Sequence, residues 1–429
     1  MSDNVSTGGG RRSVLPELSS GRAYHPFTAR FPLTCKISFP YTPAMPDYNL
    51  AEFLRISAVL NYMLSAKRPD WGSVTSIVLE GKAISSHDQD VLIDVFDYLS
   101  SIYGKTKRDL GPFSVLHPVR ATALLSHASD KLVLLDLMTC LLHDNFEDFQ
   151  PAKFKAADWI KLDNKFQSFL TKLPEDRQQQ LREHLQWLTK EPAETYYHYI
   201  GRLLERACNC PEVVRVKLAD RLDNTFDMRI ELQDPLQGVD FFEIIFQMMF
   251  SSTYKGYRPE KPHQPTLILN GAERLYQLFK NIVLLSLIRQ RRSAGGDAIG
   301  QGLFNALAKA SMQEAQRIAL HIFGYHETTL STFKNILLET MAYSQSHGID
   351  TVTRPDAKHR LDGLFMSVFD QPQRDARKKH LAQLYGDKPL MIQVAVSFVI
   401  IFLNFLNDAD YFVRGISAEG IRPETVCSP

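Results

Sequence analysis

A polar cluster interrupts an apolar stretch in the first half of the chain. His143, Asp144, Glu147 and Asp148 follow residues 132–140, which are almost entirely apolar. In an α-helix, residues four positions apart share a face, so His143 would lie over Glu147 and Asp144 over Asp148. Burying such a quartet without partners would be costly. The cluster therefore predicts a site for a metal ion and a polar substrate.

Two further segments supply residues of the same chemistry. His117 stands directly before Pro118, at the start of an apolar run, and Asp220 lies on a predicted helix with Asn224 one turn later. A set of two imidazoles and two carboxylates suits Mn²⁺, Fe²⁺ or Zn²⁺ and leaves positions open for water and phosphate oxygens. The predicted ligands are His117, His143, Asp144 and Asp220.

The order His…His-Asp…Asp resembles the HD superfamily of metal-dependent phosphohydrolases. Residues 141–148 are similar to that family's Leu-Leu-His-Asp-x-x-Glu-Asp segment, and residues 217–224 to its Lys-Leu-Ala-Asp-Arg-Leu-x-Asn segment. These segments, together with residues 189–190 and 194–200, resemble the hydrolase domain of the RelA/SpoT family, whose members remove the 3′-pyrophosphate from ppGpp. The resemblance covers roughly residues 90–290.

The resemblance implies a role for each matching residue. Glu147 and Asp148 would orient and deprotonate the attacking water, and either could be the proton acceptor. Arg108 and Lys217 would bind phosphate, and Asn224 would contact the ribose or position the metal ligands. The implied cofactor is a divalent metal, with Mn²⁺ as the first choice and Fe²⁺ or Zn²⁺ as alternatives. The implied partner is a small nucleotide, with ppGpp as the leading substrate.

Simpler interpretations of the same residues exist. Asp220 could form an ion pair with Lys217 or Arg221 on its own helix. Glu147 and Asp148 could be solvated acids at a helix end.

The chain also departs from the family. Asp109 stands where the family has lysine, Ser114 where a tyrosine is common, and Asp223 where a histidine is frequent. These departures motivate a second hypothesis from a different functional class. In that hypothesis the fold is a catalytically weak module for nucleotide sensing or protein interaction.

Composition narrows the class of protein. The chain has 429 residues, of which 44% are hydrophobic and 23% charged, as is usual for soluble globular proteins. The formal net charge of +1 gives no electrostatic case for nucleic acid as the main partner. Five scattered cysteines favour a reducing compartment, here the cytoplasm, over a disulfide framework. We interpret Cys208-Asn209-Cys210 as structural or incidental, because zinc knuckles usually place two residues between the cysteines.

Neither end of the chain is expected to carry a targeting or membrane segment. Residues 1–20 are rich in glycine and serine, and no apolar stretch follows, so we expect a disordered tail rather than a signal peptide. Residues 390–406 are strongly apolar but are interrupted by Gln393, Ser397 and Asn404. They are near the lower length limit for crossing a bilayer, so a buried helix is favoured and no membrane is expected.

The periodicity predicts a mostly α-helical protein. Residues 21–87 would form an N-terminal extension with short extended segments, including a strand at 73–80. Residues 88–292 would form the HD helical bundle, with one helix over 131–147. Residues 298–429 would form an additional C-terminal helical region after a glycine-containing linker.

Overall fold

A computed structural model describes the chain from residue 49 to residue 422 with several gaps. The described ranges are 49–104, 106–107, 113–228, 236, 238–250, 270–291, 296–325, 329–346, 349–355, 358–371 and 373–422. The predicted tail (1–20) and the extended segments expected within residues 21–48 lie outside these ranges, as does most of the predicted linker at 293–297.

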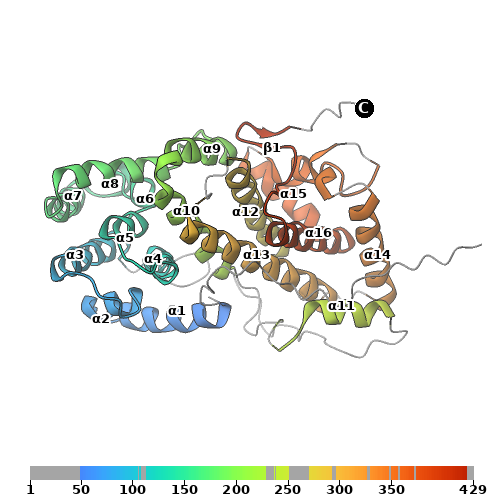
Figure 1. The fold of residues 1–429 in the computed structure, drawn as a ribbon, viewed down its shortest axis with the longest axis horizontal. Coiled ribbons are helices and arrows are strands. Elements are labelled where there is room, and N and C mark those ends of the chain that lie inside the picture. Colours follow the sequence, from blue (N-terminus) through green and yellow to red (C-terminus); the bar gives the residue numbers. More distant parts are fainter. Residues whose placement is uncertain are drawn as a thin grey trace, which may run out of the picture. The chain divides into compact units, whose positions relative to one another are not determined.

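The fold is mostly α-helical, as predicted, and the chain carries a helical C-terminal region (Figure 1). The described residues form sixteen α-helices. The helices before the first long gap are α1 (Leu50–Leu64), α2 (Trp71–Val78), α3 (Ser86–Tyr103), α4 (Leu116–Ala128), α5 (Leu134–Leu141), α6 (Asn145–Asp148), α7 (Ala156–Leu170), α8 (Glu175–Leu188), α9 (Tyr196–Arg206) and α10 (Pro211–Phe226). The later ones are α11 (Phe241–Phe250), α12 (Gly271–Arg291), α13 (Ala298–Tyr325), α14 (Leu330–Ser346), α15 (Arg374–Gly386) and α16 (Lys388–Asn407).

A few short elements complete the chain. They are the 3₁₀ turns Pro151–Lys153, Ala207–Asn209 and Ile349–Thr353, a π-helical turn Phe365–Phe369, and an antiparallel hairpin of β1 (Ile416–Ser417) and β2 (Gly420–Ile421).

Helix α10 is the central element for the site. It packs against α4 and α5 on the N-terminal side of the chain and against α13 on the C-terminal side. Because neighbours surround it, its charged residues Asp220, Arg221 and Asp223 are buried with its apolar ones. Polar groups buried in this way must find partners within the protein.

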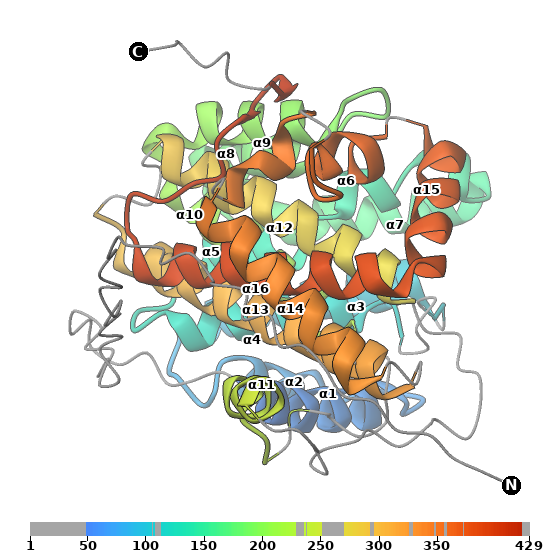
Figure 2. The ribbon, with the colours of Figure 1, turned by 90° about the vertical axis from the view of Figure 1, so that its right-hand side faces the viewer.

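The predicted HD bundle and the C-terminal region share a hydrophobic core. One cluster of buried side chains includes Leu218 of α10, Leu278 of α12, Phe304 of α13 and Phe398 of α16. Helices α13, α14 and α16 lie side by side and join this cluster (Figures 1 and 2). A second cluster holds α2, α3 and α7 together on the other side. The C-terminal region therefore helps to fix α10, and with it Asp220.

Helix α16 contains the strongly apolar segment. By length and composition alone it is the one described helix that could cross a membrane, but 67% of that stretch is buried inside the protein. Gln393 and Ser397 point into the protein with it and are both buried. These features fit the buried core helix that was favoured from the sequence.

Two predicted elements are wrong. Residues 73–80 do not form a strand, because α2 occupies residues 71–78. The Asp70 carboxylate caps this helix by accepting the backbone N–H groups of Gly72 and Ser73 at 3.1 and 3.3 Å. That cap outweighs the strand preference of the β-branched residues.

The predicted helix 131–147 is also interrupted, since α5 ends at Leu141 and α6 starts at Asn145. The ring of His143 lies 2.8 Å from the carbonyl of Cys140 through Nδ1 and satisfies a carbonyl that the helix end leaves free. His143 and Asp144 therefore lie in a turn rather than within a helix.

The hairpin offers a test of how the C-terminal segment is held. Gly201 of α9 faces Ala418 so closely that an added Cβ would lie 2.5 Å from the Ala418 Cβ. We expect Gly201→Ala to lower the free energy of unfolding by about 1–3 kcal/mol in urea titrations, because this overpacking outweighs the gain in helix propensity. Gly386→Ala is the control, since nothing lies within 4 Å of its added Cβ. A Gly201→Ala protein as stable as wild type would contradict this packing.

Candidate metal centre

Three segments bring the predicted metal ligands together. His117 lies in the first turn of α4, where the following proline costs no helical hydrogen bond. His143 and Asp144 come from the turn between α5 and α6, and Asp220 comes from the buried face of α10. The contacts of α4 and α5 with α10 hold the three segments against one another.

The ligand atoms converge on one point. The two Nε2 atoms of His117 and His143 lie 3.2 Å apart. Oδ1 of Asp220 lies 3.2 Å from His117 Nε2 and 3.7 Å from His143 Nε2. Oδ2 of Asp144 lies 3.5 and 3.2 Å from the same two nitrogens. Ligands that share one cation at about 2.1 Å stand about 3 Å apart, so this spacing fits a single metal ion.

The other ring nitrogens explain why these atoms suit a cation. Nδ1 of His117 lies 2.6 Å from a carboxylate oxygen of Asp223, and Nδ1 of His143 lies 2.8 Å from the carbonyl of Cys140. Both partners are acceptors, so each Nδ1 donates a hydrogen and each Nε2 faces the centre, where it can bind a proton or a cation. A proton at the centre could be shared by only one Nε2–carboxylate pair, whereas a divalent cation could be bound by all the ligand atoms at once. His117, His143 and Asp220 can thus hold a metal ion.

The electrostatics reflect a strongly negative centre. Burial lowers the pKa of His143, but the Asp144 and Asp220 carboxylates outweigh it and hold that pKa well above its usual range. Burial raises the pKa of Asp144, yet His143 and His117 bring it down to about 2. The pKa of Asp220 is lowered well below its ordinary value, because Lys217 and the two imidazoles overcome its burial. The carboxylates are therefore ionised and available to a cation.

Asp223 is a functional residue that sequence reasoning regarded only as a departure from the family. It holds His117 and also receives Nε of Arg120 at 2.8 Å. Arg120 is 1% exposed and makes a second ion pair, with Asp227 at 3.1 Å. The spacing of one helical turn between Asp220 and Asp223 was the available signal, because it places both carboxylates on adjacent parts of one face.

The predicted substrate-binding residues of α10 surround Asp220. Nδ2 of Asn224 donates to Asp220 Oδ1 at 2.6 Å, and Nζ of Lys217 lies 2.7 Å from Asp220 Oδ2. The ion pair considered as an alternative for Asp220 thus exists with Lys217 and coexists with the two imidazoles. Arg221 points elsewhere and donates to Asn281 at 2.8 Å. Arg108 lies outside the described residues, as does Asp109.

The predicted catalytic acids lie beside the centre but are held apart from its ligands. Glu147 accepts the backbone N–H of Lys190 at 2.6 Å, and Asp148 accepts the hydroxyl of Tyr103 at 2.8 Å. Burial raises the pKa of Glu147 and the charge of Asp144 adds to the rise, while the Lys190 N–H opposes it. The helical columns expected from the sequence are replaced by this arrangement, because a turn separates His143 from α6.

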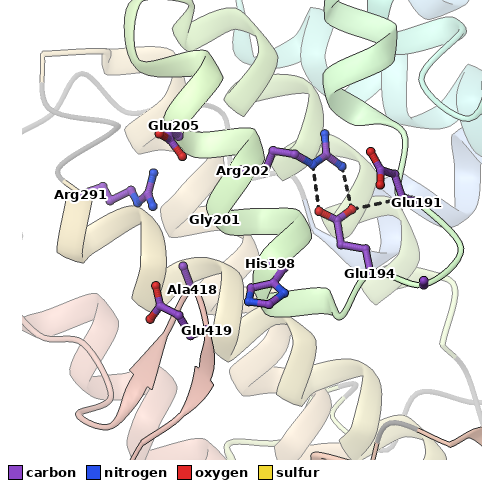
Figure 3. A pocket seen from close by; sticks show the side chains of 10 residues that line it. Glu191, Glu194, His198, Gly201, Arg202, Glu205, Arg291, Ala418 and Glu419 are labelled. Carbon is purple, nitrogen blue, oxygen red and sulfur yellow. Dashed lines mark hydrogen bonds and ion pairs between the residues drawn. The ribbon is translucent and has the colours of Figure 1, made fainter.

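A separate pocket lies on the outer face of α9 (Figure 3). It has a volume of about 490 Å³, and none of the metal-ligand candidates lines it. Within it, Arg202 contacts both carboxylate oxygens of Glu194, at 2.9 and 2.7 Å. His198, Arg291 and Glu419 surround Gly201 there (Figure 3). The pocket is therefore distinct from the histidine–aspartate centre.

Comparison with known proteins adds no assignment. No protein-family model matches the chain, and no curated protein sequence matches it significantly. The function must therefore be argued from the geometry of the centre.

Asp223 gives a direct test of the centre. We expect Asp223→Asn to weaken Mn²⁺ binding by roughly tenfold or more, because a neutral amide no longer supports the basicity of His117. Asp227→Asn is the matched control, since Asp227 also pairs with Arg120. Both variants should lower thermal stability, but calorimetric titration with Mn²⁺ should reveal a loss only for Asp223→Asn. Equal metal affinity in the two variants would contradict the role of Asp223.

Proposed function

We propose that this protein is a metal-dependent phosphohydrolase acting on a nucleotide pyrophosphate or phosphate ester. The observation that carries the proposal is the convergence of two imidazole nitrogens, 3.2 Å apart, with carboxylate oxygens of Asp144 and Asp220 that lie 3.2–3.7 Å from these nitrogens. The motif resemblance supports the same reaction class. The mixed nitrogen and oxygen ligands favour Mn²⁺, with Fe²⁺ or Zn²⁺ as alternatives.

The chain's own residues have distinct tasks in this proposal. When bound, the divalent cation would supply a water of lowered pKa and polarise a phosphoryl oxygen. Lys217 and Asn224 hold the Asp220 carboxylate through its two oxygens, which fixes that ligand. Glu147 is suited to accept the water's proton, because burial raises its pKa and makes it a stronger base. Asp148 remains the alternative acceptor.

The leading substrate is ppGpp, from which attack on phosphorus would release the 3′-pyrophosphate. This choice rests on the resemblance of residues 141–148 and 217–224 to the RelA/SpoT hydrolase domain. A cytoplasmic location would be consistent with such a substrate and with the scattered cysteines. Purified protein with Mn²⁺, Fe²⁺ or Zn²⁺ should be assayed against ppGpp, NADPH and common nucleotides.

The second candidate is a module that binds a nucleotide without turnover. It is motivated by Asp223, which occupies the position of a frequent family histidine. Tight nucleotide binding without hydrolysis at saturating metal would favour the module, and inactivity across the whole panel would count heavily against the enzyme. Rapid turnover would exclude the module.

Variants at Asp144 and Glu147 distinguish loss of metal binding from loss of catalysis. We expect Asp144→Ala to remove both bound metal and hydrolysis. It should leave the helix content unchanged, because the Asp144 side chain makes no capping hydrogen bond to α6. Glu147→Gln should keep the metal while turnover falls roughly a hundredfold, the contribution of a general base. Metal analysis, circular dichroism and turnover provide the three measurements.

Asp148→Asn is the comparison for Glu147→Gln. If only Glu147→Gln is silent, the proton acceptor is Asp148 or water. Full metal content and activity in Asp144→Ala would show that the centre is placed wrongly.

A further inference from the structure

A row of alternating cations and tyrosine rings runs from the metal centre to α15. Lys217, which contacts Asp220, lies 5.0 Å from the centroid of the Tyr199 ring. The rings of Tyr199 and Tyr196 are 6.2 Å apart, and Lys280 of α12 lies 6.0 Å from the Tyr196 centroid.

The row continues to the C-terminal region. Lys280 lies 4.9 Å from the Tyr276 centroid, and the guanidinium carbon of Arg377 lies 4.8 Å from the same centroid. We call Lys217, Lys280, Arg377 and their tyrosines the cation–tyrosine row.

The cations at the far end of the row have no carboxylate partner among the described residues. Lys280 donates to Gln277 Oε1 at 3.3 Å, and Arg377 donates to the carbonyl of Gln371 at 3.1 Å. Arg221 adds a further positive charge beside them, fixed by Asn281 and by the carbonyl of Gln277. Like charges held together without counter-ions repel one another, so this arrangement favours an anion.

The acids that act on the row do not neutralise it. Asp220 is already engaged by Lys217 and the two imidazoles. Asp370 precedes α15 and acts on Tyr276, but it forms no ion pair with Lys280 or Arg377 within the described ranges, and burial raises its pKa. Burial and the neighbouring cations Arg221, Arg377 and Lys217 lower the pKa of Lys280 to about 7. A bound anion would reverse that effect and stabilise the charged amine.

Tyr196 provides a second and independent sign of a missing ligand. Its hydroxyl is buried and has no hydrogen-bond partner in the described part of the chain. A buried hydroxyl without a partner is costly, so this hydroxyl, on a ring that lies beside Lys280, indicates a group that accepts its hydrogen. The side chains of Lys280, Tyr276 and Arg377 are only partly buried, which leaves the row accessible from solvent.

We propose that Lys280, Arg377 and the Tyr196 hydroxyl form a phosphate-binding subsite that holds a second phosphoryl group of the substrate, remote from the phosphorus attacked at the metal centre. This subsite rests on the proposed phosphohydrolase function for its biological meaning. Lys217 and Arg221 supply the positive wall between the two points. The C-terminal region thereby contributes Arg377 to substrate binding as well as packing to α10. The preferred substrates would be those with two separate phosphate-bearing positions.

Tripolyphosphate binding to metal-free protein tests the subsite without requiring turnover. Calorimetric titration should show binding by wild type, and Lys280→Gln and Arg377→Gln should each weaken it roughly tenfold or more, as for the loss of a charge-assisted contact. Arg374→Gln and Lys379→Gln are the matched controls, because both residues are exposed on α15. Neither control should change the affinity.

Folding and metal binding distinguish this role from a structural one. Lys280→Gln should melt at or above the wild-type temperature and keep its Mn²⁺ affinity, since it removes a partly buried charge that has no ion-pair partner among the described residues. No tripolyphosphate binding by wild type, or equal binding by wild type and both variants, would overturn the subsite. Absence of hydrolysis across the nucleotide panel would instead reject the proposed function, because tripolyphosphate binding is measured independently of it.

A second metal-binding group is carried by different residues. His184 of α8, Cys210 before α10 and Glu212 in its first turn offer ligand atoms that all lie within 4.8 Å of one another. His184 is 1% exposed, and neither of its ring nitrogens has a hydrogen-bond partner within the described part of the chain. An imidazole buried in this way, facing a thiol and a carboxylate, lacks the partner that buried polar groups normally have.

We infer that His184, Cys210 and Glu212 bind a transition-metal ion of the Zn²⁺ class. Imidazole, thiolate and carboxylate are all ligands of Zn²⁺, and Co²⁺ substitutes in such sites. The ion would join α8 to the start of α10. This role would differ from the structural or incidental interpretation given to Cys208-Asn209-Cys210 from the sequence.

Cobalt spectroscopy separates the two centres, because the one at His117 offers no sulfur ligand. Wild type titrated with Co²⁺ should develop a thiolate-to-cobalt charge-transfer band, and Asp144→Ala should retain it. Cys210→Ser should lose the band, whereas Cys208→Ser, which changes an exposed neighbour, should keep it. No band in wild type, or a band that survives Cys210→Ser, would overturn the inference.

Discussion

Two imidazole nitrogens that face each other at 3.2 Å are the constraint around which the site is organised. Each lone pair is fixed by what the far nitrogen contacts, a carboxylate for His117 and a carbonyl for His143. Neither ring can turn its nitrogen away without losing a buried partner. The centre must therefore hold either a proton or a cation. The high pKa of His143 shows how strongly its carboxylates attract positive charge.

The rest of the fold can be understood as support for that contact. Asp223 reaches His117 only because α10 is packed against α4, and the buried Arg120 keeps the Asp223 carboxylate ionised. Burial raises the pKa of Asp223, and Arg120 and His117 together lower it below its ordinary value. Helix α13 closes the other side of α10, and α16 packs against α13. A buried charged network of this kind requires all its members to be paired, which a surrounding core provides.

The sequence allowed the ligands to be predicted better than the local structure that carries them. Residue type and order indicated His117, His143, Asp144 and Asp220, because few other side chains bind divalent cations. Periodicity placed His143 inside a helix, since the apolar run before it gives no sign of where that helix ends. The end depends on a side-chain contact with Cys140 and on the packing around Asn145, whose amide oxygen accepts the hydroxyl of Tyr98 at 2.8 Å. The contact between Tyr98 and Asn145 joins residues that are far apart in the sequence, so the local hydrophobic pattern cannot predict it.

The cations near the site differ in whether the sequence alone could relate them to it. Lys217 was within reach of sequence reasoning because it lies one turn from Asp220 on the same helix. Lys280 and Arg377 stand on other helices, and only the fold brings them to the same tyrosine ring. The charges of Lys280 and Arg377 lower the stability of the fold, because they lack counter-ions among the described residues. This is a physical argument for function, since a protein selected for stability alone would pair or remove such charges. The same reasoning applies to His184, whose unpartnered nitrogens are unfavourable unless a metal ion or another group binds them.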